Sequence, residues 1–205
     1  MTTQNRRSKF ERVAARRQEM TVVLENVHDP HNIGAVLRSC DAVGIDEIFV
    51  LYTEDHLDFE RLEKIGTSAT GVKKWMKINC FRSVEECFKA VRSSYDKILA
   101  THLNAEAEDV YAFDLTQRVA FLFGNEHEGL TEEALQHADA NIVIPQMGMA
   151  QSLNISVACA VTIYEALRQR SEAGMYPETA EGMKTHNEQI LKRYLDIHEA
   201  SYKKE

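Results

Sequence analysis

Residues 119–130 read VAFLFGNEHEGL, a run of five apolar residues followed at once by a polar turn. A short apolar run that ends at a glycine such as Gly124 is typical of a strand buried on both faces. Comparable short runs, also expected to be strands, occur at 21–25, 47–51, 97–101 and 141–144. Helical patterns separate these runs, so the sequence predicts an α/β fold with a parallel sheet and helices on both faces.

The helical patterns differ in how much apolar surface they carry. In residues 32–44, apolar side chains recur at the helical spacing of 33, 36, 37 and 40, and Gly44 is a plausible C-terminal stop. Ile155–Leu167 is apolar nearly all round, which predicts burial in the core or in a subunit interface. Shorter helices are expected at 84–91 and 131–137, and a last one at 187–202.

Charge is distributed unevenly over the 205 residues. The net charge is −8, yet residues 1–17 carry six basic side chains and one acidic one, Glu11. A basic N-terminal arm, taken as residues 1–20, could bind phosphates locally, although a solvated basic helix without a partner would show the same pattern. The N-terminus has no apolar signal region and no segment is long enough for a bilayer, so we expect a cytoplasmic protein without membrane contact. The four cysteines match no zinc spacing, and no metal site is expected.

Ligands of parallel α/β sheets bind beyond the carboxyl ends of the strands. Three polar segments follow expected strands there: HDPHNIGAVLRS at 28–39, FGNEHEGL at 123–130 and IPQMGMAQSLNIS at 144–156. Taken singly, each has an ordinary explanation, because Asn32 could be a helix cap and Arg38 a surface arginine. The chain lacks the glycine patterns of nicotinamide dehydrogenases, P-loop enzymes and α/β-hydrolases, so these classes are poorly supported.

Together and in this order, the three segments resemble the three motifs of the SPOUT superfamily, in its TrmH-like branch, over about residues 21–170. The resemblance implies an S-adenosylmethionine-dependent RNA 2′-O-methyltransferase that works as a homodimer. It also implies that the C-terminal part of the domain is threaded as a deep trefoil knot, a feature nearly absent from other folds.

The same resemblance implies which residues form the site. The cofactor would be held in the knot by Thr101, Gly124, Ile144, Met149, Ser152 and Leu153. Arg38 would lie beside the reacting hydroxyl, helped by Asn32, Glu126, Ser152 and Asn154. Because a guanidinium normally stays charged, the stabilisation of a developing alkoxide, or contact with a phosphate, suits Arg38 better than proton abstraction. Arg38 is expected to be essential, and its protonation role is left open.

A basic arm followed by a domain at 21–170 and a helical extension at 171–205 resembles the branch members that methylate guanosine 18 in the D-loop of tRNA. The residues expected to bind RNA are Arg6, Arg7, Arg12, Arg16, Arg17, His31, Arg168 and Arg170. Other substrates, namely rRNA or the tRNA wobble nucleotide, remain open. So do a catalytically silent RNA-binding module and a small-molecule enzyme whose motifs match by chance.

Overall fold

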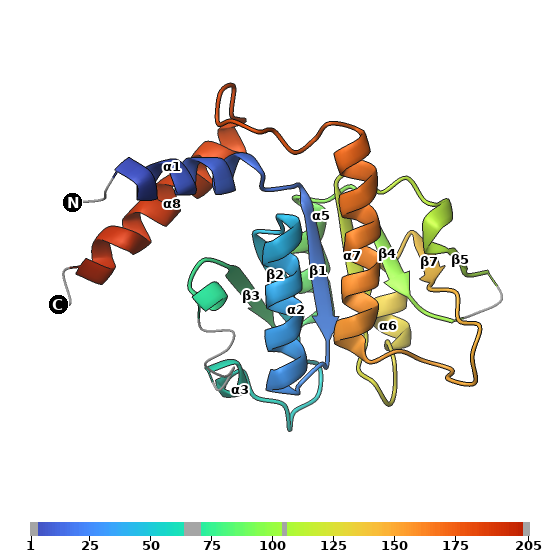
Figure 1. Cartoon of the computed structure of the whole chain (residues 1–205). Coiled ribbons are helices and arrows are strands. Elements are labelled where there is room, and N and C mark those ends of the chain that lie inside the picture. Colours follow the sequence, from blue (N-terminus) through green and yellow to red (C-terminus); the bar gives the residue numbers. More distant parts are fainter. Residues whose placement is uncertain (1–3, 64–70, 104–105, 203–205) are drawn as a thin grey trace.

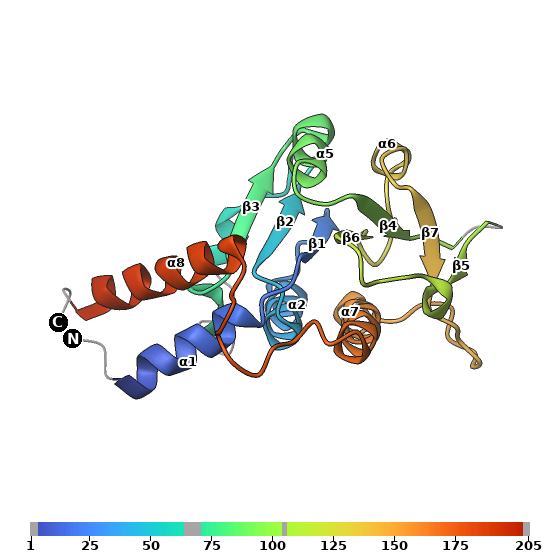
Figure 2. The ribbon, with the colours of Figure 1, turned by 90° about the horizontal axis from the view of Figure 1, so that it is seen from above.

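The computed structural model describes residues 4–63, 71–103 and 106–202. Its centre is a seven-stranded sheet in which every neighbouring pair of strands is parallel. The strand order is β3-β2-β1-β6-β4-β7-β5 (Figures 1 and 2). In that order the strands are Lys77–Phe81, Glu47–Leu51, Met20–Glu25, Val119–Phe123, Lys97–Thr101, Ala140–Val143 and Glu108–Asp109.

The two central strands, β1 and β6, are buried along their whole length. Their register pairs Leu24 with Phe123, while Glu25 pairs with Leu51 of β2. The ends of β1, β2 and β6 are therefore level, and the segments that follow them start at one edge of the sheet. This edge is the place where the sequence predicts a ligand.

Helices cover both faces of the sheet (Figure 2). One face carries α2 (Pro30–Val43) and α7 (Ile155–Glu172), and the other carries α5 (Val84–Arg92) and α6 (Glu132–Leu135). The predicted parallel α/β sheet with helices on both faces is confirmed. The deep trefoil knot is a matter of threading that strand order alone does not define, and it stays a prediction.

Local sequence sets the limits of α2. Asp29 caps its first turn by accepting a hydrogen bond from the backbone nitrogen of His31 at 2.9 Å. Gly44 ends it in the left-handed region, with φ 91°, which confirms the predicted stop. Helix α7 runs to Glu172, beyond the predicted end at 167, and so crosses the expected domain boundary at residue 170.

The two ends of the chain meet outside the sheet. Helix α1 (Gln4–Ala15) lies along α8 (Thr185–Tyr202), as Figures 1 and 2 show. Phe10 and Ala14 of α1 pack with Ile190 and Tyr194 of α8 in a small core of their own. The basic arm is therefore largely a helix with one packed side. Short elements of the described chain include α3 (Glu60–Glu63) and a 3₁₀ turn at Val110–Ala112. Within the described ranges, no helix combines the length and apolar character needed to cross a membrane.

Candidate active site

Three segments far apart in the sequence meet at the carboxyl edge of the sheet. The side-chain nitrogen Nδ2 of Asn32 donates a hydrogen bond to Oε1 of Glu126. The Nδ2 atom of Asn154 donates in turn to Oδ1 of Asn32, at 3.1 Å. One residue from each predicted motif thus joins a continuous chain of hydrogen bonds.

Asn154 shows how one side chain serves structure and site together. It caps α7, since its Oδ1 accepts hydrogen bonds from the backbone nitrogen and the hydroxyl of Ser156, at 2.9 and 2.6 Å. Its amide nitrogen is left for Asn32, which lies in the first turn of α2. Two helix N-termini are therefore joined side chain to side chain at the site.

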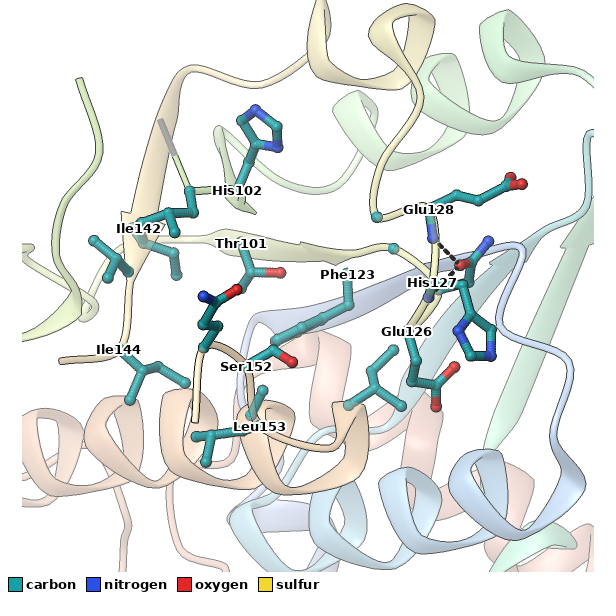
Figure 3. Close-up of a pocket in the computed structure, with 18 of the residues that line it drawn as sticks. Thr101, His102, Phe123, Glu126, His127, Glu128, Ile142, Ile144, Ser152 and Leu153 are labelled. Atoms are coloured by element: carbon teal, nitrogen blue, oxygen red, sulfur yellow. Dashed lines mark hydrogen bonds between the residues drawn. The ribbon is translucent and has the colours of Figure 1, made fainter. Parts of the chain in front are cut away.

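The turn that carries Glu126 is closed by its own backbone. Asn125 and Gly129 exchange two backbone hydrogen bonds of 3.1 Å, and Oδ1 of Asn125 accepts from the nitrogens of His127 and Glu128. Gly124 is required here, because a Cβ atom on it would lie 2.1 Å from the carbonyl oxygen of Gly129. The closed turn presents Glu126 to Asn32. Glu126 also lines the neighbouring cavity (Figure 3).

Beside this contact lies a cavity of about 450 Å³, within the range of roughly 300–1,000 Å³ that is usual for small-molecule sites. Five of the predicted cofactor-binding residues line it: Thr101, Gly124, Ile144, Ser152 and Leu153 (Figure 3). Met149 does not line it and is 100% exposed, so its predicted cofactor contact is not supported. The sequence did not single out other lining residues, among them Phe123, Ile142, His102, His127, Gln146 and Gln151.

Arg38 lies apart from this cavity in the single chain. It is exposed on α2, six residues beyond Asn32, and does not line the cavity. It forms no hydrogen bond or ion pair with any residue in the described part of the chain. Its guanidinium is therefore available to a group that arrives from outside. His31, one residue before Asn32, is also exposed.

Two of the arginines expected to contact RNA are buried instead. The side chain of Arg17 bonds Oδ1 of Asp41 at 2.5 Å and the hydroxyl of Tyr194 at 2.7 Å. Arg170 is fully buried, and its Nε donates to the carbonyl oxygen of Leu115 at 3.0 Å. The prediction that these two bind RNA is wrong, because their donors are already used inside the protein.

The other predicted RNA contacts are on the surface. Arg6, Arg12 and Arg16 are exposed, although Nε of Arg16 donates to the carbonyl oxygen of Pro177. Arg7 pairs with Glu11 one helical turn away, at 3.0 Å. Arg168 is exposed but lies between Glu165 and Glu172, with ion-pair distances of 2.8 and 2.7 Å. No three His, Cys, Asp or Glu side chains of the described chain cluster as metal ligands would.

Comparison with known proteins agrees with this geometry. A model of the SpoU rRNA Methylase family matches residues 19–164. The chain belongs to this family. The tRNA (guanosine(18)-2′-O)-methyltransferase of Thermus thermophilus is 42% identical over 175 residues, which are 85% of this chain and 88% of the relative. The family expected from the three motifs is thereby confirmed.

Two solved structures show where the likeness lies. The A. aeolicus TrmH/SpoU tRNA modifying enzyme superposes with a TM-score of 0.77 at 34% identity and covers 94% of this chain and 96% of its own. An AdoMet-bound rRNA methyltransferase from Sinorhizobium meliloti gives a TM-score of 0.60 at 29% identity, over 78% of this chain and 59% of its own. The first likeness extends over nearly the whole chain.

Proposed function

We propose that this protein transfers a methyl group from S-adenosylmethionine to a ribose 2′-hydroxyl of RNA, at guanosine 18 in the D-loop of tRNA. The observation that carries the proposal is the hydrogen-bonded chain Asn154–Asn32–Glu126 beside a cavity of cofactor size. The tRNA (guanosine(18)-2′-O)-methyltransferase of T. thermophilus, similar over most of both chains, supports the choice of substrate. A cytoplasmic location belongs to the same proposal, since tRNA is the substrate.

The cavity suits S-adenosylmethionine in its chemistry. Ile142, Ile144 and Leu153 offer an apolar wall for a flat purine, while hydroxyl groups of Thr101 and Ser152 lie in the same lining. The carboxylates of Glu126 and Glu128 suit the positive charges of the ligand. When bound, S-adenosylmethionine supplies an electrophilic methyl group on a sulfonium. The bound cofactor in the S. meliloti relative supports this assignment.

The residues around the cavity would act mainly by holding the hydroxyl in line with the methyl group, since positioning supplies much of such an acceleration. Asn32 and Asn154 hold Glu126 in place, and a carboxylate so held can accept a hydrogen bond or a proton from a hydroxyl. Arg38 keeps its charge and stabilises the developing alkoxide or a neighbouring phosphate. Ser152, at the cavity, completes this proposed catalytic set.

Assembly and threading are further parts of the proposal. Helix α7 leaves Val157 and Tyr164 about half exposed, at 47% and 48%, on the side away from the sheet. These side chains support a homodimer in which α7 is covered by a second copy. Family resemblance also supports a deep trefoil knot formed by the segments around the cavity.

tRNA would be bound by the exposed basic side chains of α1, namely Arg6, Arg7 and Arg12, and by Arg16 just after it, with His31 and Arg168 nearer the site. Phosphate contacts of this kind hold a nucleic acid in register without reading its sequence. The choice of nucleotide therefore depends on how the bound tRNA presents its D-loop to the cavity.

The test is to map 2′-O-methyl groups after incubation of the protein with S-adenosylmethionine and either an unmodified tRNA transcript or rRNA. We expect one new methyl group, at guanosine 18 of the tRNA. A transcript with 2′-deoxyguanosine at that position should accept none. Methylation of rRNA or of the wobble nucleotide alone would contradict the substrate assignment, and no methylation of any RNA would contradict the enzymatic proposal.

A further inference from the structure

Glu25, the last residue of β1, is a carboxylate with no exposed surface. Burial of a carboxylate is unfavourable unless hydrogen bonds compensate for the water it loses. Both oxygens of Glu25 are used by one partner: Oε2 accepts from the backbone nitrogen of Thr131 at 2.9 Å, and Oε1 from its hydroxyl at 2.6 Å. Burial raises the pKa of Glu25, and the two bonds from Thr131 oppose that rise only in part. Glu25 is not among the residues that line the cavity.

Thr131 marks the far end of the turn that carries Glu126. Its hydroxyl also caps α6, since it accepts a hydrogen bond from the nitrogen of Ala134 at 3.2 Å. The near end of the same turn is Phe123, which pairs with Leu24 in the sheet. Both ends of the turn are thus attached to the last two residues of β1.

The next residue fixes the other half of the site. Asn26 has φ 53°, an unusual value for a residue other than glycine. Its side chain is held on both sides by Thr53, because Nδ2 donates to the threonine hydroxyl and Oδ1 accepts from the threonine nitrogen, each at 2.9 Å. This strained residue sets the direction in which the chain leaves β1 for α2 and Asn32. Glu25 and Asn26 therefore lie at the base of both loops whose tips meet in the Asn32–Glu126 contact.

We propose that Glu25 is a positioning residue for methyl transfer: its buried carboxylate holds Thr131, and through Thr131 it keeps Glu126 within reach of Asn32. This inference rests on the proposed function. The role requires hydrogen-bonding atoms of the right reach. It does not require a negative charge, because Glu25 touches neither the cavity nor the reacting groups. A glutamine can keep both contacts, since its oxygen can accept from the Thr131 nitrogen while its amide donates to the hydroxyl.

The experiment compares Glu25→Met, which keeps the length of the side chain and removes its acceptors, with Glu25→Gln. We expect Glu25→Met to lower kcat by about ten- to a hundredfold, because small misplacements of reacting groups have effects of that order. KM for tRNA and the affinity for S-adenosylmethionine should stay within about twofold of the wild type. Glu25→Gln should restore most of kcat. Thr131→Val, which removes only the hydroxyl, should give a smaller loss that is not additive with Glu25→Met.

Asp139→Asn is the matched structural control. Asp139 also accepts a hydrogen bond from a backbone nitrogen, that of Ile98, and it forms an ion pair with Arg92. It lies away from the Asn32–Glu126 contact. It should change the unfolding temperature without changing kcat. Full activity of Glu25→Met would overturn the inference. Equal loss in Glu25→Gln and Glu25→Met would also overturn it, since the charge itself would then be needed. An inactive wild type would instead contradict the proposed function.

Discussion

The carboxyl edge of the sheet and the terminal helix pair α1–α8 use charged residues in opposite ways. At the edge, Glu126 and Arg38 are exposed; Glu126 accepts one hydrogen bond, from Asn32, and Arg38 forms none with the described residues. Beside the helix pair, Arg17 in the link from α1 to β1 is buried and bonded to Asp41 of α2 and Tyr194 of α8. Groups at the edge are free to meet a substrate, whereas the buried arginine is committed to holding helices together. Substitutions should therefore separate into those that affect turnover and those that affect stability.

The largest effect is expected for Arg38→Ala. Loss of a cation aimed at charge that develops in the transition state should lower kcat by about 10²–10³. The unfolding temperature and the binding of S-adenosylmethionine, measured by calorimetry, should be unchanged, because Arg38 bonds no described residue and lies outside the cavity lining. Arg38→Lys keeps the charge without the planar fork and should recover only part of the rate. Full activity of the Arg38→Ala variant would show that Arg38 is not part of the active site.

The next effect should fall on stability alone. Arg17→Ala leaves the partly exposed Asp41 without its guanidinium partner, whereas Asp46 keeps Arg193. The loss should therefore lie near the lower end of the roughly 3–5 kcal/mol that breaking a buried pair costs. Urea unfolding measures this loss, with Arg16→Ala as the neighbouring exposed control, expected to cost less than about 1 kcal/mol. At temperatures where Arg17→Ala is folded, kcat should match the wild type. A kcat loss without a stability loss would reverse the comparison.

A smaller effect should appear in RNA affinity. The triple substitution Arg6→Ala, Arg7→Ala and Arg12→Ala removes charge from α1 and leaves its packed residues, Phe10 and Ala14, in place. Affinity for tRNA should fall about tenfold or more, and the slope of log affinity against log salt should decrease by roughly one for each phosphate that the variant no longer binds. Turnover at saturating tRNA should not change. Unaltered affinity at moderate salt would exclude α1 from the RNA-binding surface.

The smallest effect concerns the half-exposed pair Arg92–Asp139. Burial alone would raise the pKa of Asp139, but hydrogen bonds from Arg92 and the Ile98 nitrogen lower it further than burial raises it. Its contribution to stability is therefore present above the unfolded pKa of about 3.9 and is lost as pH falls through the lower folded value. Because the pair is exposed, the contribution is below about 1 kcal/mol. Thermal unfolding followed against pH tests this: below pH ~4 the unfolding temperature of Asp139→Asn should fall less steeply than that of the wild type. Parallel curves for the two proteins would contradict this assignment.

Much of the fold is accessible from sequence because its signals are local. Short, mostly apolar runs marked β1, β2 and β6 as strands, and Gly44 marked the end of α2. Whether an arginine is buried or exposed cannot be predicted from its local sequence in the same way. Arg17 and Arg170 look like their exposed neighbours in the sequence, and only their partners, such as the distant Tyr194 and the Leu115 carbonyl, make them structural.

The residues of the site also divide into those that the sequence predicts and those that only the structure shows. Asn32, Glu126 and Asn154 could be predicted to meet because each follows a strand of one parallel sheet. Met149 belongs to the third motif, yet membership of a motif does not tell which way a side chain points, and this one points to solvent. Glu25 has no signal at all in the sequence. A glutamate at the end of a strand is ordinarily exposed. Only its hydrogen bonds to Thr131, 106 residues away, show that it is buried and holds another segment of the chain.

The central claim is that the turns after β4, β6 and β7 enclose one ligand, S-adenosylmethionine. Hydrogen–deuterium exchange of the wild-type protein with and without this ligand tests it most directly. We expect added protection in residues 101–103, 124–130 and 144–153 together, and none in α1 or α8. Protection confined to the terminal helices, or of only one of the three turns, would contradict the account.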